Sequence, residues 1–222
     1  MSIWTIFSVR WDFLTELCAS VPANGKLVEP WLDARAPEVM PPGAKTIDEI
    51  QEEVLDTLAN PALAPAPLRV FQRVDGQLVQ RAATIRAHLK DCARVLSAQY
   101  IGKIKGERSF ATRMVNGLYP DPQQYWIPIL RPDGSRVAEP DGIRDKPVHA
   151  RGPRGEPINA LKQFEWVEPA RLDFRLMVLG KSCSQKDLET LAQYSGVHGF
   201  AGERSDGAGK YMATFTLVEE AE

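Results

Sequence analysis

Cysteine and histidine are scarce in this chain, with three of each among 222 residues. The cysteines (Cys18, Cys92 and Cys183) lie far apart and form no CxxC pair, so the sequence indicates neither a disulfide framework nor a zinc knuckle. It also contains no Walker loop and no dinucleotide fingerprint, and we therefore expect neither a metal nor a cofactor. Isolated cysteines are typical of a reducing compartment, so we expect a cytoplasmic protein.

Long apolar runs are also missing from the sequence. No segment reaches the roughly 18 residues that a membrane-spanning helix needs. The N-terminal sequence MSIWTIFSVRWDF has neither the charged start nor the small-residue cleavage site of a signal peptide. We therefore expect an unexported protein without a membrane partner. The apolar content of 44% is sufficient for a buried core.

The chain carries no strong net charge, since 27 basic and 29 acidic residues give −2 at pH 7. This balance argues against a protein whose whole surface binds polyanions. The charges are unevenly spread, because residues 27–60 hold eight acids and two bases whereas residues 81–113 hold eight bases and two acids. A basic face of this kind can bind nucleic acid, meet the acidic face of a neighbouring copy, or simply be solvated.

Hydrophobic patterning predicts a strand and two helices in the first half of the chain. Residues 3–14 alternate as a central strand. Residues 18–45 contain five prolines and are expected to form an irregular connection, followed by a capped helix. A hairpin signal at Asp75 and Gly76 precedes a second helix over residues 84–99.

The second half begins with residues 102–157, which are rich in Gly, Pro and Arg and poor in regular pattern. We interpret them as a large irregular insertion within the domain. Residues 172–178 then alternate as a strand. Ser184 and Asp187 cap a helix, and residues 211–218 form a closing strand. These pieces favour an α+β fold in which an antiparallel sheet is backed by helices.

The segment GVHGFAGERSDGAGKY, residues 196–211, places five glycines between the last predicted helix and the last strand. Glycine has no Cβ, so we expect something to approach this backbone closely. Arg204 and Lys210 suggest that a ligand here is anionic. Alternatively, Arg204 pairs with Glu203 or Asp206 and the glycines only permit a tight strand entry. Because the segment leaves a helix and enters a strand, the reverse of a phosphate loop, nucleotide hydrolysis is disfavoured.

Three short motifs of this sequence match the motifs of a known family. The glycine segment matches an R-S-x-G-x-G-R-[aromatic] core, with lysine for the second arginine, at Gly199, Gly202, Arg204, Ser205, Gly207, Gly209, Lys210 and Tyr211. The segment HARGPRGEPINALKQFEWVEPARLDFRL resembles a basic stretch followed by F-x-x-E-x-V-P, through Arg151, Arg154, Gly155, Phe164, Glu165, Val167 and Pro169. RAATIRAHLKDCARVL resembles the start of a first long helix, without the usual Pro-Gly-Ser turn. Together they resemble the RAMP superfamily of CRISPR-associated proteins, which includes the repeating backbone subunits of RNA-guided effector complexes.

The resemblance implies a single RAMP-like domain over residues 1–222 with a modified ferredoxin-like, RRM-related fold. It also implies a non-catalytic subunit that binds single-stranded RNA, or DNA, within a multi-subunit CRISPR-type ribonucleoprotein or filament. Its partners would be other subunits, including copies of itself. An alternative is a phage or mobile-element relative that uses the same fold as a protein-interaction module.

Cations and loop glycines are the residues expected to contact nucleic acid. A basic row on the second predicted helix, with the cations after it, would make phosphate contacts that weaken with salt, or would merely solubilise an exposed face. The full set is Arg86, Lys90, Arg94, Lys103, Lys105, Arg108, Arg151, Arg154, Gly202, Arg204, Gly207, Gly209 and Lys210. Tyr125 and Trp126 either stack on bases or belong to the core.

A metal-independent endoribonuclease is the alternative to binding alone, because some members of the resembled family cleave RNA. His198 lies in the glycine segment, where it could reach a 2′-hydroxyl or a phosphate. Asp33 lies in the loop after the first strand, where some members of that family carry a cleaving aspartate. His88 lies beside the basic row. A histidine without a visible partner is more often structural than catalytic.

Overall fold

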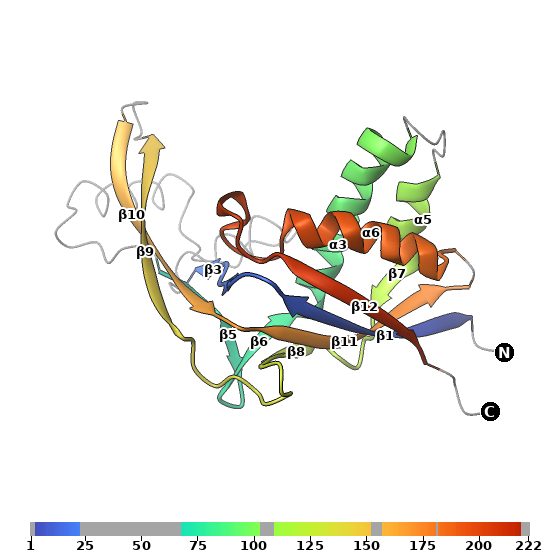
Figure 1. The fold of residues 1–222 in the computed structure, drawn as a ribbon, viewed down its shortest axis with the longest axis horizontal. Coiled ribbons are helices and arrows are strands. Elements are labelled where there is room, and N and C mark those ends of the chain that lie inside the picture. The colour runs from blue at the N-terminus through green and yellow to red at the C-terminus, as the bar shows by residue number, and fades with distance from the viewer. Residues whose placement is uncertain (1–2, 23–67, 103–108, 152–156, 181, 219–222) are drawn as a thin grey trace, which may run out of the picture. The chain divides into compact units, whose positions relative to one another are not determined.

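The computed structural model describes residues 3–22, 68–102, 109–151, 157–180 and 182–218 (Figure 1). These residues group into two compact units. The first comprises Met1–Ser20, Phe71–Gly142 and Trp166–Glu222, and the second comprises Val21–Val70 and Ile143–Glu165. The helix predicted after the proline-rich connection, and nearly all of that connection, lie outside the described residues.

The first unit is built on an antiparallel sheet with the strand order β12-β1-β11-β8-β6-β5, in which β7 also pairs with β11. β1 (Trp4–Phe13) lies between β11 (Arg171–Leu179) and β12 (Tyr211–Leu217). β11 pairs on its other side with β7 (Leu118–Pro120) and β8 (Trp126–Leu130). β1 therefore has a neighbour on both sides, which confirms the predicted central strand.

Helices cover one face of this sheet (Figure 1). α3 (Ala82–Leu96) continues as a π-helical turn over Ser97–Ile101 and is followed by α5 (Phe110–Gly117). α6 (Gln185–His198) connects β11 to β12. The chain thus passes through helices between β1 and β7 and again between β11 and β12, and the order β12-β1-β11-β7 is that of a ferredoxin-like sheet. The predicted α+β class, with an antiparallel sheet backed by helices, is confirmed.

Local sequence accounts for the main elements of the first unit. In β1, Phe7, Val9 and Trp11 are buried and alternate with the exposed Ser8 and Arg10. This period of two is what a strand with one covered face requires.

The predicted helix cap and hairpin are both present. The Ser184 side chain accepts from the Asp187 amide while the Asp187 carboxylate accepts from the Ser184 amide, which completes a capping box at the start of α6. Asp75 and Gly76 both have positive φ, of 50° and 71°, as a tight type I′ hairpin turn requires. They join β5 (Gln72–Val74) to β6 (Gln77–Arg81), and β6 extends the sheet by pairing with β8.

An aromatic cluster occupies the core between the sheet and the helices. The Trp11 ring stacks on Tyr211 with 4.2 Å between centroids, and it meets Phe174 and Phe200 edge-on at 5.1 and 5.3 Å. These rings come from β1, β12, β11 and the glycine segment. The glycine segment is therefore part of the same core as the sheet.

Strands make up the described part of the second unit. β3 (Val21–Pro22) pairs with β4 (Leu68–Val70), and β4 runs parallel to β10 (Pro157–Val167). β9 (Gly142–Arg151) also pairs with β10. In the first unit, the last two residues of β10 pair with β2 (Leu17–Cys18).

Residues 102–157 are more regular than their composition indicates, since they contain α5, β7, β8 and β9. The predicted irregularity does not hold for these elements. α5 has eight residues and the strands β7 and β8 have three and five, which is too short for a hydrophobic period to emerge from the sequence. Within the described ranges, no helix has both the length and the hydropathy needed to cross a membrane.

Candidate nucleic-acid interface

The glycine segment after α6 is closed against the protein's own backbone. The amides of Gly202 and Gly209 donate to the carbonyls of Cys18 and Glu16 at 3.0 and 2.8 Å, and the Phe200 amide donates to the Gly209 carbonyl at 2.8 Å. A Cβ on Gly202 would collide with the Ala19 carbonyl oxygen, and one on Gly209 with that of Phe200. The close approach that the glycines permit is therefore an approach of the chain to itself.

This closure engages the amides of the loop glycines, so we consider the segment's cationic side chains as contacts for a ligand. The Gly207 amide is also engaged, because it donates to the Arg204 carbonyl at 3.0 Å. Arg204 and Lys210 are exposed. One guanidinium nitrogen of Arg204 lies 3.2 Å from His198 Nε2, a partner that the sequence did not suggest.

A buried polar chain lies beneath this segment. The Tyr211 hydroxyl donates to Ser195 Oγ at 2.7 Å and lies 3.0 Å from His88 Nε2. His88 Nδ1 lies 3.7 Å from the Cys92 sulfur. Ser195 in turn donates to the Ala192 carbonyl at 3.5 Å. Tyr211, Ser195, His88 and Cys92 thus form one connected set of buried polar side chains.

Burial keeps this chain uncharged. Burial, with added repulsion from the charges of Arg204 and His198, lowers the pKa of His88 to about 3. Burial raises the pKa of the Cys92 thiol to about 12 and also raises the pKa of the Tyr211 hydroxyl. His88 is therefore neutral near pH 7 and is a structural residue of the core.

His198 lies at the exposed end of α6, between two other rings. It is nearly parallel to His88 and to Tyr194, with centroids 6.1 and 5.7 Å away. Partial burial and then the charge of Arg204 lower its pKa. Because Arg204 donates to Nε2, the nitrogen that a general base would use is already occupied.

The predicted basic row on α3 is divided by its contacts. Arg86 Nε donates to the Leu118 carbonyl at 3.1 Å, and its guanidinium lies 4.1 Å from the Tyr119 ring centroid. Lys90 is half-buried, and Arg94 is exposed with Asp91 at 3.4 Å. The three cations therefore lie in three different environments. Lys103, Lys105, Arg108, Arg154, Asp33 and the side chain of Arg151 lie outside the described residues.

Sequence reasoning missed the face of the sheet opposite the helices, which we call the open face. On β1 it carries Ser8, Arg10 and Asp12, and on β11 it carries Arg171, Asp173 and Arg175. The registers place Ser8 opposite Arg175, Arg10 opposite Asp173, and Asp12 opposite Arg171. No described helix packs on this side (Figure 1). The signal was present in the alternation of the two strand sequences, where a charged set interleaves with the apolar one.

The open face mixes arginines with acids. Arg10 Nε lies 3.2 Å from Asp173, Arg171 lies 3.0 Å from the same carboxylate, and Arg175 lies 3.9 Å from Asp121. The side chains of Arg10 and Arg175 are 53% and 54% exposed. Ion pairs of such exposed arginines are weak, so Arg10 and Arg175 can exchange a carboxylate for a phosphate at little cost.

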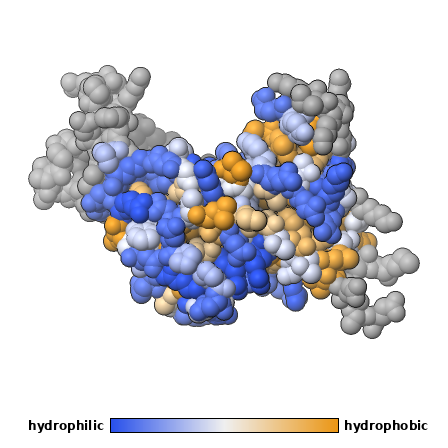
Figure 2. Space-filling view, in the orientation of Figure 1, coloured by the Kyte–Doolittle hydropathy of each residue, from blue (hydrophilic) through white to orange (hydrophobic). Residues whose placement is uncertain are grey.

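Aromatic and apolar side chains border the open face at two places. Trp4 and Tyr119 meet edge-on at 5.6 Å, and Tyr125 and Trp126 meet edge-on at 4.9 Å beside Arg81. Tyr125 is 48% exposed, so it is a surface ring rather than a core residue. Figure 2 shows apolar residues gathered around the end of the sheet where β1 begins and β12 ends. The exposed ones there include Ile3, Leu179 and Leu217.

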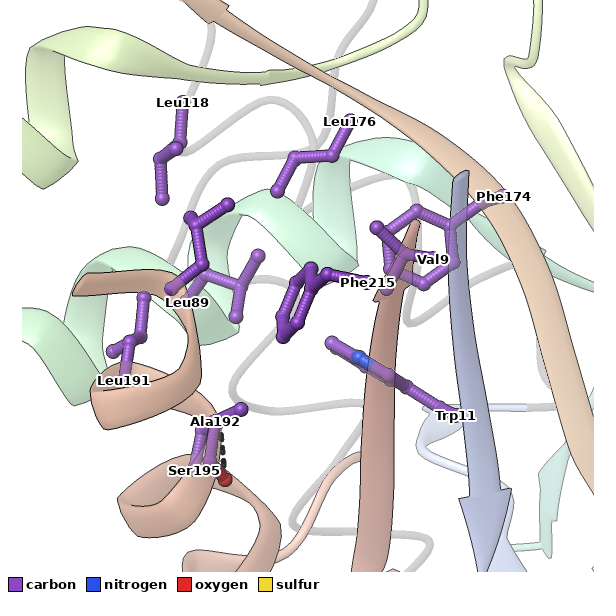
Figure 3. Close-up of a pocket in the computed structure, with 11 residues that line it drawn as sticks. Val9, Trp11, Leu89, Leu118, Phe174, Leu176, Leu191, Ala192, Ser195 and Phe215 are labelled. Atoms are coloured by element: carbon purple, nitrogen blue, oxygen red, sulfur yellow. Dashed lines mark hydrogen bonds between the residues drawn. The ribbon is translucent and has the colours of Figure 1, made fainter. Parts of the chain in front are cut away.

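A small cavity lies between the sheet and helices α3 and α6, and its walls are apolar apart from the Ser195 hydroxyl and the Trp11 ring nitrogen (Figure 3). It belongs to the hydrophobic core. In the part of the chain that the structure describes, no three His, Cys, Asp or Glu side chains gather as metal ligands would. The three cysteines are buried thiols.

Comparisons with known proteins find similar chains among the solved structures. No family model matches the sequence, and no curated protein matches it. A chain in the cryo-EM structure of the Type III-B Cmr-beta bound to cognate target RNA is similar with a TM-score of 0.42 and 12% identity. The match covers 98% of this protein and 62% of that chain, so this protein spans less than two thirds of its length. A TM-score and an identity this low assign no function to this protein. Its function is inferred from the side chains described above.

Proposed function

We propose that the protein binds single-stranded nucleic acid, RNA in the first instance, as a non-catalytic subunit of a multi-subunit CRISPR-type assembly. The observation that carries this proposal is the open face, where the exposed Arg10 and Arg175 lie on a helix-free sheet bordered by surface rings. Arginine is suited to phosphate oxygens, and rings accept bases of any sequence. This combination is what a polynucleotide backbone binder needs.

The proposal that the subunit is non-catalytic is supported by its histidines. His88 is buried and neutral, and His198 accepts a hydrogen bond from Arg204 on Nε2. A ribonuclease that used either of them as its general base would need that imidazole free to take a proton from a 2′-hydroxyl. Incubation with labelled single-stranded RNA in EDTA tests this directly. Cleavage that is lost in His198→Ala would establish the endoribonuclease instead.

The test of binding is the salt dependence of RNA affinity, measured by fluorescence anisotropy with a labelled single-stranded 20-mer. We expect affinity to fall steeply with salt, and the double variant Arg10→Ala/Arg175→Ala to reduce the slope by about 1 to 2. Lys186→Ala is the matched control, because Lys186 is an exposed cation on α6, on the other side of the sheet.

A second candidate function is a protein-interaction module. It is favoured by the acids of the open face, since Asp12 and Asp173, with Asp121 beside Arg175, equal the three arginines in number. A balanced charged face suits a partner protein of mixed charge. If neither RNA nor DNA is retained even at low ionic strength, this second function replaces the first. Recovering the protein from its native cells and sequencing any co-purified nucleic acid separates the two functions, because only the first predicts a bound RNA or DNA.

A further inference from the structure

The turn before β8 holds an exposed ring in a fixed position. Arg81 donates a hydrogen bond to the Tyr125 hydroxyl, and its guanidinium carbon lies 5.5 Å from the Tyr125 ring centroid and 5.7 Å from that of Trp126. Trp126 supports Tyr125 edge-on, with 4.9 Å between centroids and an angle of 89°. Three side chains therefore form one cluster at the surface, which we call the Tyr125 cluster.

The backbone fixes the same cluster. Arg81 and Trp126 are directly paired residues of β6 and β8, and the Ala82 amide donates to the Tyr125 carbonyl at 3.0 Å. Tyr125 is nevertheless 48% exposed. A ring that is already immobile loses little entropy when a flat ligand stacks on it, so this arrangement is prepared for binding.

Arg81 has no opposing carboxylate among the described residues. Its Nε is buried and has no hydrogen-bond partner there, and its guanidinium is held by the two rings and the tyrosine hydroxyl. Other arginines of the first unit, such as Arg10 and Arg131, have an acid within 3.2 Å. A partly buried cation without a counter-ion favours an anionic ligand.

A second cation lies close to the same turn. The Arg175 amide donates to Gln124 Oε1 at 2.6 Å, and the Asp121 amide donates to the Arg175 carbonyl at 3.0 Å. The turn that carries Tyr125 is thus attached to β11 at Arg175, whose side chain is 54% exposed.

We propose that Tyr125 is a stacking platform for one nucleobase of a single-stranded polynucleotide, with Arg81 and Arg175 receiving the adjoining phosphates. This inference rests on the proposed function and assigns a particular position to one base. The Tyr125 ring accepts any base, because every base has a π-face, and the two arginines bind phosphates, which are the same at every nucleotide. The site therefore contributes affinity without sequence preference.

The test uses the full-length protein and a single-stranded oligouridine that carries one 2-aminopurine, a base whose fluorescence falls when it stacks. Total affinity is measured in parallel by anisotropy. Tyr125→Ala should weaken binding by about 5- to 100-fold and abolish the quenching. Tyr125→Leu, which keeps apolar bulk in the turn, should also abolish the quenching, and Tyr125→Phe should largely retain it.

Tyr100→Ala is the matched control, because Tyr100 is 46% exposed in the π-helical turn after α3. It should leave affinity and quenching unchanged. If Tyr125→Ala and Tyr125→Leu both bind and quench like the native protein, the stacking proposal is wrong while nucleic-acid binding stands. If the native protein binds no RNA or DNA at low salt, both proposals are wrong. Circular dichroism of each variant confirms that it is folded.

Discussion

The glycine segment and the open face differ in how well their sequence composition indicates their role. The glycine segment has the composition of a ligand loop, yet its amides bond to residues 16, 18, 204 and 209 of the same chain. The open face has an ordinary strand composition, yet it presents exposed arginines on a helix-free sheet. The glycines of the glycine segment allow the chain to pack against itself. The ordinary alternation of β1 and β11 produces the charged open face.

The largest expected effect is on the free energy of unfolding, when a glycine that packs against backbone is compared with one that has open space around it. Gly209 and Gly76 have nearly the same φ, 70° and 71°, but a Cβ on Gly209 would collide with the Phe200 backbone whereas nothing lies within 4 Å of one on Gly76. Gly209→Ala should lower the free energy of unfolding by roughly 3 to 5 kcal/mol. Gly76→Ala should cost only about 1 kcal/mol, as expected for strained φ alone. Urea denaturation measures both.

If Gly209→Ala instead folds normally and loses RNA affinity, the glycine segment is a ligand loop. The contrast between the two regions would then be reversed.

The next effect concerns the buried chain beneath the glycine segment. Tyr211→Phe removes the hydroxyl that joins His88 to Ser195 and leaves both polar groups buried without it. We expect a loss of about 2 to 3 kcal/mol in the free energy of unfolding. Tyr194→Phe is the control, because the half-buried Tyr194 contributes a ring contact to His198. An equal effect from both variants would contradict a special role for the chain.

His88 should make stability depend on pH. Its pKa is about 3 in the folded state against 6.5 as a model value, so below pH 6.5 the unfolded chain takes up a proton that the folded chain refuses. The free energy of unfolding should therefore fall by about 2 kcal/mol between pH 6.5 and pH 5 from this group. The charged or titratable groups facing it are Arg204, His198, Tyr211 and Cys92.

The contribution of His88 is isolated by difference. His88→Gln removes the titrating group, so the native protein should lose more stability than this variant over the same pH range. Parallel curves for the two proteins would mean that His88 is not held neutral by burial.

The smallest effect tests whether Arg204 belongs to the fold or to a ligand site. Arg204 is exposed, so Arg204→Ala should change the free energy of unfolding by less than about 0.5 kcal/mol. Because the Arg204 charge lowers the pKa of His198, that pKa should rise in the variant, as an NMR titration of the imidazole would record. Lys210→Ala is the control and should leave the titration of His198 in place.

The sequence predicted the elements with a long, uninterrupted period or an explicit end signal. β1, β11 and β12 alternate over seven or more residues, and α6 begins at the Ser184 capping box. α5 was missed because its eight residues are too few for a helical period to stand out. The pairing of Arg204 with His198 was also missed, since it depends on how the glycine segment turns back after α6.

The candidate site was harder to predict than the fold for a physical reason. Which side of β1 faces solvent depends on which side the helices cover, and that is a tertiary property. Arg10 and Arg175 therefore looked like ordinary strand cations. Arg86 looked like a phosphate contact, although it bonds the Leu118 carbonyl and covers Tyr119.

Cross-linking tests the central claim most directly. The native protein is bound to single-stranded RNA containing 4-thiouridine, irradiated, and digested for mass spectrometry of the RNA-linked peptides. The account predicts links within β1, within β11 and in the turn that carries Tyr125. Links confined to residues 199–210 would contradict it and would show that the glycine segment is the nucleic-acid interface.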